Sequence, residues 1–379
     1  MMSFFAGKWP RSQAFVAWEV AARCILAMIC LLAAADAASA GEGRLARQNA
    51  ASIEPLNEVE TGYGEIQTLE GYRLRTIATR PADARGRLPA IYFVQWLSCD
   101  TVEIGPSNDG WTQMLRSLVS DSGMVVVRLE KAGVGDSEGG PCVDLDYETE
   151  LAHHRLALRA AREHRWVDRR RVFVFGASMG ANMAPLLAAE APVRGVAVWG
   201  GGAQSWFERQ LGFERRSLEL RGATGSEIDA RMRDLSRFYS ALLVDQLSLS
   251  EITARNRSLR QMWPSLAGVE GETQFGRPVR FHQQAQARHW AAAWAAIDAP
   301  VLAMFGEYDW YEDPAGVQLI GSIANARSPA SGEVRIFEGL DHHFMRYRSQ
   351  ADAFVDSGGE PDPTEVMELL LPWLRRHAQ

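Results

Sequence analysis

The chain has 379 residues, of which 47% are hydrophobic and 23% are charged, and its formal net charge is −7 at pH 7. This composition is ordinary for a globular protein with a large core, and it excludes a disordered or low-complexity chain. The acidic balance excludes an electrostatic footprint for nucleic acid or for anionic lipid, because the one basic run, Arg169–Arg171, is short and local.

The N-terminal 40 residues have the pattern of a secretory signal peptide. Three basic residues precede the apolar run Cys24–Ala35, and Ala38-Ser39-Ala40 forms a small-x-small cleavage signal. The apolar run is too short to span a bilayer, although an uncleaved membrane anchor stays an alternative. We therefore expect an exported protein, periplasmic or secreted, with no stable membrane insertion after signal cleavage.

The elements expected after the signal begin with a flexible lead-in at residues 41–60. Glu65–Thr79 alternates around a turn at Glu70-Gly71, which predicts a β-hairpin. Continuous apolar strands then alternate with helical stretches, a pattern typical of a parallel sheet covered on both faces. We expect strands at 90–94, 124–129, 171–175 and 193–199, and helices at 111–119, 147–164 and 181–189.

The alternation stops between about residues 203 and 296, where we expect amphipathic helices and no strand. Ser226–Asp229 is similar to a capping box that opens one of these helices. The strand pattern resumes at Pro300–Phe305 and Val334–Phe337, and a final helix covers about 363–376. The sequence thus predicts a core of residues 61–202 and 297–379, with a helical cap at 203–296 over the carboxyl edge of the sheet.

One segment carries a chemical signature. Gly176-Ala177-Ser178-Met179-Gly180 directly follows the apolar run Val172–Phe175 and matches G-x-S-x-G, in which a serine sits on a sharp turn between a strand and a helix. The required strand lies before it and a helix-forming segment after it. The sequence therefore predicts that Ser178 is a nucleophile; the alternative is a turn that only packs.

A serine hydroxyl needs a base to remove its proton and a third group to orient that base. The expected acid is Asp309, which follows the strand ending at Phe305 in a G-x-x-D spacing, with Glu307 and Asp313 as rivals. The expected base is His342, just after the last strand, in preference to its neighbour His343.

The remaining histidines are weaker candidates for the base. His377 lies two residues from the end of the chain, where we expect fraying. His153 and His154 are expected on a solvated helix face out of reach of the serine. His282 and His289 fall near the end of the cap, where they either line the pocket or lie on the surface.

The tetrahedral intermediates of acyl transfer need two backbone N–H donors for the oxyanion. Met179, the residue after the nucleophile, is expected to supply one. The other is expected from Trp96 or Leu97, in the loop after the 90–94 strand. A loop that supplies this donor usually begins with His-Gly-x. Here the loop begins with Gln95-Trp96-Leu97 instead.

Aromatic and cysteine residues complete the candidate site. Trp96, Trp199, Trp206 and Trp310 lie at or shortly after strand ends, and they are expected either to shape the pocket or to pack in the core. Of the four cysteines, Cys24 and Cys30 would leave with the signal peptide. Cys99 and Cys142 remain, and in an oxidising compartment they predict a disulfide, with two free buried thiols as the alternative.

In chain order, Gly176–Gly180, Gly306-x-x-Asp309 and Gly339-x-Asp341-His342-x-Phe344 make the chain resemble the α/β-hydrolases. The turn Gly133–Ser137 adds to the resemblance, which covers about residues 60–379 apart from the cap. It implies the α/β-hydrolase fold, with a mostly parallel central sheet, helices on both faces and a helical cap insertion.

The resemblance also implies a catalytic triad of Ser178, Asp309 and His342, with no metal and no organic cofactor. A bridge between Cys99 and Cys142 would brace the loop that carries Trp96 and Leu97. The leading hypothesis is an exported serine hydrolase that cleaves carboxylic esters through an acyl-enzyme. A serine exopeptidase of the prolyl-oligopeptidase-like kind, a thioesterase and a non-catalytic binding protein on the same fold are the alternatives, so the expected partner is a small ester or a short peptide.

Overall fold

The computed structural model describes Leu45 and residues 56–379. The expected signal peptide, residues 1–40, and most of the expected lead-in lie outside the described residues. Within the described part, no helix combines the length and apolar character that a membrane crossing requires.

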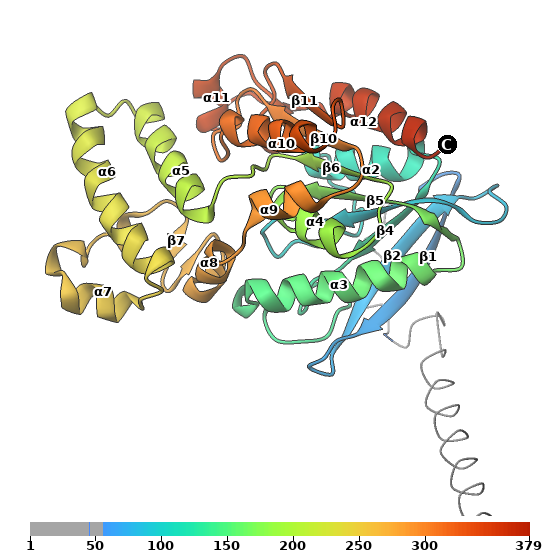
Figure 1. Ribbon diagram of the computed structural model, residues 1–379, viewed down its shortest axis with the longest axis horizontal. Helices are drawn as coiled ribbons and strands as arrows, with labels where there is room; N and C mark the ends of the chain where they lie inside the picture. The colour runs from blue at the N-terminus through green and yellow to red at the C-terminus, as the bar shows by residue number, and fades with distance from the viewer. Residues whose placement is uncertain (1–44, 46–55) are drawn as a thin grey trace, which may run out of the picture. The chain divides into compact units, whose positions relative to one another are not determined.

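A twisted sheet of eight strands forms the centre of the structure (Figure 1). The strands are β1 (Val59–Gln67), β2 (Arg73–Pro81), β3 (Leu88–Val94), β4 (Val125–Leu129), β5 (Val167–Ala177), β6 (Gly195–Trp199), β10 (Val301–Gly306) and β11 (Gly332–Phe337). They lie in the order β1-β2-β4-β3-β5-β6-β10-β11. β2 pairs antiparallel with β1 and with β4, and all pairs from β4 to β11 are parallel.

Successive side chains of the central strands enter two different cores. In β3, Ile91 and Phe93 lie in one apolar cluster, and Tyr92 and Val94 lie in the other. A strand buried on both faces is apolar at nearly every position, which explains why these strands read as continuous apolar runs instead of alternating ones.

Helices cover both faces of the sheet. They are α2 (Gly110–Asp121), α3 (Tyr147–Glu163), α4 (Met179–Glu190), α9 (Trp290–Ala296), α10 (Pro314–Arg327) and α12 (Thr364–His377). Side chains of α2 and α12 share the cluster that holds Phe93, whereas α3, α4 and α10 share the cluster that holds Tyr92 (Figure 1). The prediction of a mostly parallel sheet with helices on both faces is confirmed.

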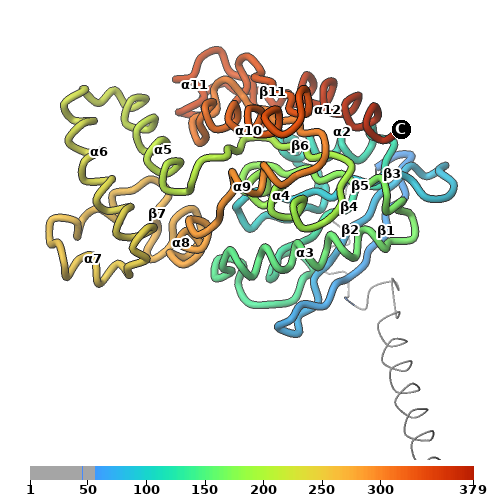
Figure 2. Tube along the Cα trace, in the orientation of Figure 1, coloured from blue at the N-terminus to red at the C-terminus, as the bar shows by residue number. Residues whose placement is uncertain are grey.

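The chain between β6 and β10 forms an insertion at one end of the sheet. Besides α9, its α-helices are α5 (Trp206–Leu220), α6 (Gly225–Tyr239), α7 (Leu249–Arg255) and α8 (Val279–Gln286). Figure 2 shows the chain leaving the sheet after β6 and returning through α8 and α9. A smaller hairpin of β12 (Met345–Arg346) and β13 (Glu360–Pro361), with the short helix α11 (Gln350–Phe354) between them, follows the last strand of the sheet.

The expectation of an insertion without strands is wrong. Three two-residue strands, β7 (Val269–Glu270), β8 (Thr273–Gln274) and β9 (Arg277–Pro278), pair antiparallel in a small sheet of their own. Strands this short carry no alternation that a sequence pattern could show. The capping box also begins two residues earlier than expected, because the side chain of Thr224 caps α6 and Glu227 completes the box.

His153 and His154 of α3 are buried, so the expectation of a solvated helix face is wrong. His154 Nδ1 lies 2.8 Å from the hydroxyl of Tyr92, and His153 Nε2 lies 3.2 Å from a carboxylate oxygen of Glu70. Burial lowers the pKa of His154 to about 4, which keeps its imidazole neutral between the sheet and the helix. Both side chains therefore help to pack α3 against the sheet.

Candidate active site

Ser178 lies on the turn between β5 and α4, with φ 57° and ψ −117°. A positive φ is strained for a residue with a side chain, and such residues cluster at functional sites. The main-chain N–H of Ser178 donates to the carbonyl oxygen of Trp199 at 2.8 Å. A Cβ at Gly176 would collide with the carbonyl of Gly180, and a Cβ at Gly180 would collide with the carbonyl of Val94. The close backbone approach at this turn thus requires both glycines.

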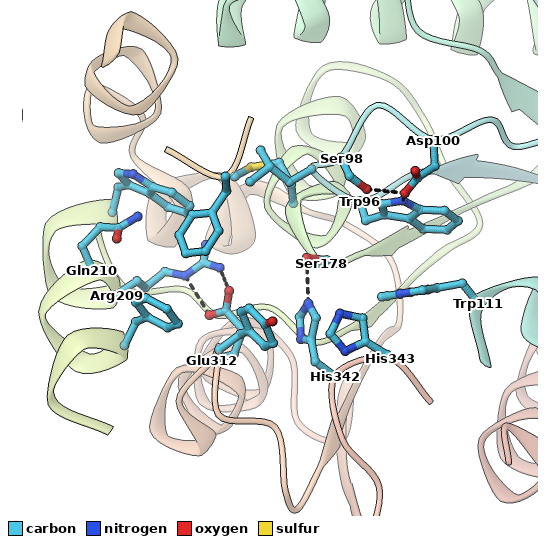
Figure 3. A pocket seen from close by; sticks show the side chains of 16 residues that line it. Trp96, Ser98, Asp100, Trp111, Ser178, Arg209, Gln210, Glu312, His342 and His343 are labelled. Atoms are coloured by element: carbon cyan, nitrogen blue, oxygen red, sulfur yellow. Dashed lines mark hydrogen bonds and ion pairs between the residues drawn. The ribbon is translucent and has the colours of Figure 1, made fainter. Parts of the chain in front are cut away.

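His342 connects Ser178 to Asp309, and Figure 3 shows its contact with Ser178. Its Nε2 lies 2.8 Å from Ser178 Oγ, and its Nδ1 lies 2.6 Å from Asp309 Oδ2. The other carboxylate oxygen of Asp309 accepts the main-chain N–H groups of Tyr311 at 2.9 Å and Glu312 at 3.0 Å. When Nδ1–H donates to Asp309, Nε2 carries the lone pair that can accept the serine proton.

The rival residues occupy other places. Glu307 accepts the main-chain N–H of Gly339 at 2.9 Å, so it supports the loop that carries the histidine. Asp313 caps α10 by accepting the N–H of Ala315 at 2.8 Å. The structure therefore brings Asp309, rather than Glu307 or Asp313, to the imidazole of His342.

His343 lies beside His342 but faces Asp341, with 3.3 Å between Nδ1 and Oδ2. Burial by itself would lower the pKa of His343, but the hydrogen bond and charge of Asp341, with the charge of Asp309, outweigh burial and raise the pKa above its ordinary value. The imidazole that reaches Ser178 is therefore that of His342, not that of His343.

The residues expected to supply the oxyanion donors lie at the same cavity as the serine. Met179 is the first residue of α4, and Trp96 and Leu97 belong to the loop after β3. As expected, the structure joins Cys99 and Cys142 in a disulfide, which ties this loop to the segment after β4.

A cavity of about 430 Å³ opens at Ser178 and His342. The cavity is lined by Trp96, Leu97, Ser98, Asp100, Trp111, Ser178, Met179, Trp206, Arg209, Gln210, Phe213, Phe275, Tyr311, Glu312, His342 and His343. Of the tryptophans expected to shape it, Trp96 and Trp206 do so, and Trp310 lines a neighbouring cavity. Trp199 is fully buried in the core, and Trp111 is a wall of the cavity that sequence reasoning missed.

A buried ion pair lies on the opposite side of Ser178 from Trp96 and Trp111 (Figure 3). Arg209 of α5 binds Glu312 through two nitrogens, one of them at 2.9 Å from Nε to Oε2. Burial lowers the pKa of Arg209 to about 9. No motif in the sequence predicts this ion pair, because Arg209 and Glu312 lie far apart in the chain.

The two histidines of the insertion, His282 and His289, do not line the cavity. His282 is buried, stacks on Trp206 with ring centroids 5.8 Å apart, and has its Nε2 3.1 Å from the carbonyl oxygen of Gln274. His289 is exposed, as the surface alternative expected. Among the described residues, no three or more His, Cys, Asp or Glu side chains gather in a group that could hold a metal ion.

No protein-family model and no curated protein matches the chain. Similar solved structures do exist. A hypothetical protein from Pseudomonas aeruginosa has a TM-score of 0.54 and 15% identity, over 87% of this chain and 98% of that one. An esterase from Pyrococcus furiosus has a TM-score of 0.52 and 12% identity, over 84% of this chain and 91% of that one. DcsB, in complex with its substrate analogue, has a TM-score of 0.51 and 14% identity, over 84% of this chain and 100% of that one.

These likenesses concern the fold, because the identities are low. This chain itself has an eight-stranded, mostly parallel sheet with an antiparallel second strand, and a serine on the turn after β5. Together, these features show that the chain has the α/β-hydrolase fold.

Proposed function

We propose that this protein is an exported serine hydrolase that cleaves carboxylic esters through an acyl-enzyme. The observation that carries the proposal is the chain of two hydrogen bonds from Ser178 through His342 to Asp309, at 2.8 and 2.6 Å. Fold alone does not determine activity, so the proposal rests on this geometry and on the cavity beside it.

In the proposed reaction, His342 Nε2 takes the proton of Ser178 as the Oγ attacks the ester carbonyl carbon. The N–H of Met179 and an N–H of the loop after β3 stabilise the negative charge that develops on the carbonyl oxygen. The protonated imidazole, held by Asp309, then gives its proton to the departing alcohol. A water molecule repeats the attack on the acyl-enzyme, with His342 again as the base, and releases the acid.

The cavity supports a small ester as the substrate. A volume of about 430 Å³ lies within the range of small-molecule sites, and tryptophans and other aromatic residues form much of its wall. The proposed export rests on the signal-like N-terminal sequence and on the disulfide between Cys99 and Cys142, because disulfides persist in oxidising compartments.

The test uses the purified protein, a panel of p-nitrophenyl esters of increasing acyl length, and aminoacyl-p-nitroanilides as the amide arm. We expect turnover of esters, its loss in Ser178→Ala, and a single phosphonate adduct on Ser178 in the mass spectrum of the wild-type protein. Faster turnover of the amides than of the esters would favour the exopeptidase alternative. Ester turnover that persists in Ser178→Ala would refute the assignment of the nucleophile.

A further inference from the structure

Two buried basic side chains, Lys131 and Arg277, donate hydrogen bonds to main-chain carbonyl groups of the loop after β3. The ammonium of Lys131, which follows β4, donates to the carbonyl oxygens of Trp96 at 2.5 Å, Leu97 at 3.0 Å and Ser98 at 2.9 Å. The guanidinium of Arg277 donates to the carbonyl of Leu97 from Nε at 3.0 Å and from Nη2 at 2.6 Å. Arg277 belongs to β9 of the cap, so the core and the cap both hold the same loop.

A single carboxylate, that of Glu150, lies between the two side chains, and burial lowers the pKa of Lys131 to about 7 although the charge of Glu150 opposes this shift. Glu150 of α3 places Oε1 3.1 Å from Lys131 Nζ and Oε2 2.9 Å from Arg277 Nη2, and all three side chains are at most 2% exposed. Burial by itself would raise the pKa of Glu150, but the charges of Arg277 and Lys131 together hold it below its ordinary value. Buried ion pairs are often no more stabilising than apolar side chains of the same volume, so stability does not by itself account for this cluster.

The residue type at position 131 is informative. The sequence contains only two lysines, Lys8 and Lys131, among its 40 lysines and arginines. An ammonium is a compact charge with three donors that can serve three carbonyls at one point, whereas the planar guanidinium fork of arginine suits paired acceptors. The lysine therefore matches the three converging carbonyls of residues 96–98.

The hydrogen bonds to these carbonyl groups also restrict the directions of the N–H groups in the same peptides. In a trans peptide the C=O and the N–H point in opposite directions, and no peptide bond between described residues is cis. The carbonyl of Trp96 points to Lys131, so the N–H of Leu97 points away from Lys131. Leu97 lines the cavity of Ser178, and Lys131 does not. This arrangement is compatible with an N–H of Leu97 that faces the cavity.

We infer that Lys131 and Arg277 are positioning residues for the oxyanion hole, which hold the carbonyls of Trp96 and Leu97 on one side of the loop and aim the N–H of Leu97 at the substrate oxygen. The inference rests on the proposed function and favours Leu97 over Trp96, because neither Lys131 nor Arg277 donates to the carbonyl of Gln95, which shares its peptide with the N–H of Trp96. It also assigns the cap a part in the chemistry, because Arg277 reaches the loop from β9 and donates to the carbonyl of Cys142 at 2.9 Å as well.

The test compares Lys131→Met with Arg75→Met. Arg75 is a suitable control because it is equally buried and donates to the carbonyls of Gly64 and Leu45, away from the loop. In Lys131→Met, we expect kcat for p-nitrophenyl acetate to fall by at least tenfold and by at most about 1,000-fold, because complete loss of one oxyanion donor lowers kcat by about 100- to 1,000-fold, with KM nearly unchanged. In Arg75→Met, we expect a lower unfolding midpoint and an unchanged kcat.

A second readout follows the donor itself. In the ¹⁵N-labelled wild-type protein, formation of the phosphonate adduct should move the amide proton of Leu97 downfield, and this shift should be lost in Lys131→Met. If Lys131→Met does not fold, Arg277→Lys serves in its place, because a lysine there keeps a cation but cannot repeat both hydrogen bonds to Leu97. A lower kcat and a lost Leu97 shift in Arg277→Lys would support the inference.

Wild-type kcat and an unchanged Leu97 shift in Lys131→Met, or in Arg277→Lys where that variant is used, would overturn the inference. The proposed function fails in a different way. A wild-type protein that neither hydrolyses the ester nor forms the phosphonate adduct would overturn the hydrolase proposal, and the inference with it.

Discussion

The indole Nε1 of Trp199 donates a hydrogen bond of 2.9 Å to the main-chain carbonyl of His342. The carbonyl of the same tryptophan accepts the N–H of Ser178 at 2.8 Å. Its ring stacks on Phe344, with ring centroids 4.3 Å apart. The last residue of β6 therefore holds both the loop of the nucleophile and the loop of the base, although it does not line the cavity.

We expect Trp199→Phe to lower kcat several-fold with little change in KM. Phenylalanine keeps an aromatic ring but removes the donor, so the buried carbonyl of His342 loses its partner and the free energy of unfolding falls by about 1–3 kcal/mol. Ester kinetics and urea unfolding measure the two effects. Trp373→Phe is the matched control, because Trp373 is equally buried and its indole nitrogen has no hydrogen-bond partner among the residues that the structure describes. Equal kcat in both variants would contradict the role of Trp199.

The disulfide between Cys99 and Cys142 closes a loop of 43 residues in sequence separation. Restricting the unfolded chain over such a loop contributes on the order of 4 kcal/mol in the chain-entropy model. We expect the variant with both Cys99→Ala and Cys142→Ala to lose about this much free energy of unfolding in urea. A titration of thiols in the unreduced wild-type protein, produced without residues 1–40, provides the control and should find none. Full stability of the double variant would show that the bond does not restrain the unfolded chain.

The parts of the fold and site that the sequence predicted have strong local signals. Continuous apolar runs predicted the central strands, because a strand buried on both faces leaves no room for polar residues. Ser178 was predicted from a pentapeptide with its strand and helix around it. Asp309 and His342 followed because the carboxyl ends of parallel strands meet at one edge of a sheet, so residues just past these ends come together.

The parts that the sequence did not predict depend on contacts between distant segments. Arg209 and Glu312 are 103 residues apart, and Arg277 and Leu97 are 180 residues apart. No local pattern shows that such residues will meet. The sequence also contains no sign that His154 is buried. A histidine on a helix is expected at the surface unless it has a buried polar partner, and that partner, the hydroxyl of Tyr92, lies on a distant strand.

The ion pair of His343 with Asp341 should make stability depend on pH. The pKa of His343 is raised in the folded state, so its contribution is fully present below its unfolded value of about 6.5 and is lost as the pH rises through the raised value. We expect the difference in unfolding free energy between wild type and His343→Gln to be larger at pH 5.5 than at pH 8.5. Urea unfolding at the two pH values measures it.

His289→Gln is the control for this pH dependence. His289 is exposed, and no ion pair between described residues includes it, so its replacement should change stability equally little at both pH values. A difference between wild type and His343→Gln that stays constant from pH 5.5 to pH 8.5 would contradict the role assigned to Asp341.

Among single substitutions in the cavity wall that replace a charged side chain by an uncharged one, we expect Glu312→Gln to lower stability most, because Glu312 pairs with the buried Arg209. Glu312→Gln leaves the guanidinium of Arg209 buried without its counter-charge, and breaking a buried pair in this way costs about 3–5 kcal/mol. Replacing both partners, as in the double variant Arg209→Met with Glu312→Leu, should recover much of that loss because no lone charge remains. Urea unfolding of the three proteins measures both values.

The control for this pair lies on the same helix. Glu219 of α5 pairs with Arg215 at 3.8 Å, with both side chains about half exposed, and exposed pairs of this kind contribute only about 0.5 kcal/mol. Glu219→Gln should therefore leave the free energy of unfolding nearly unchanged. A loss in Glu312→Gln no larger than that in Glu219→Gln would mean that water reaches Arg209 through the cavity and solvates it. In that case the double variant would recover nothing, so the two outcomes separate a dry ion pair from a hydrated one.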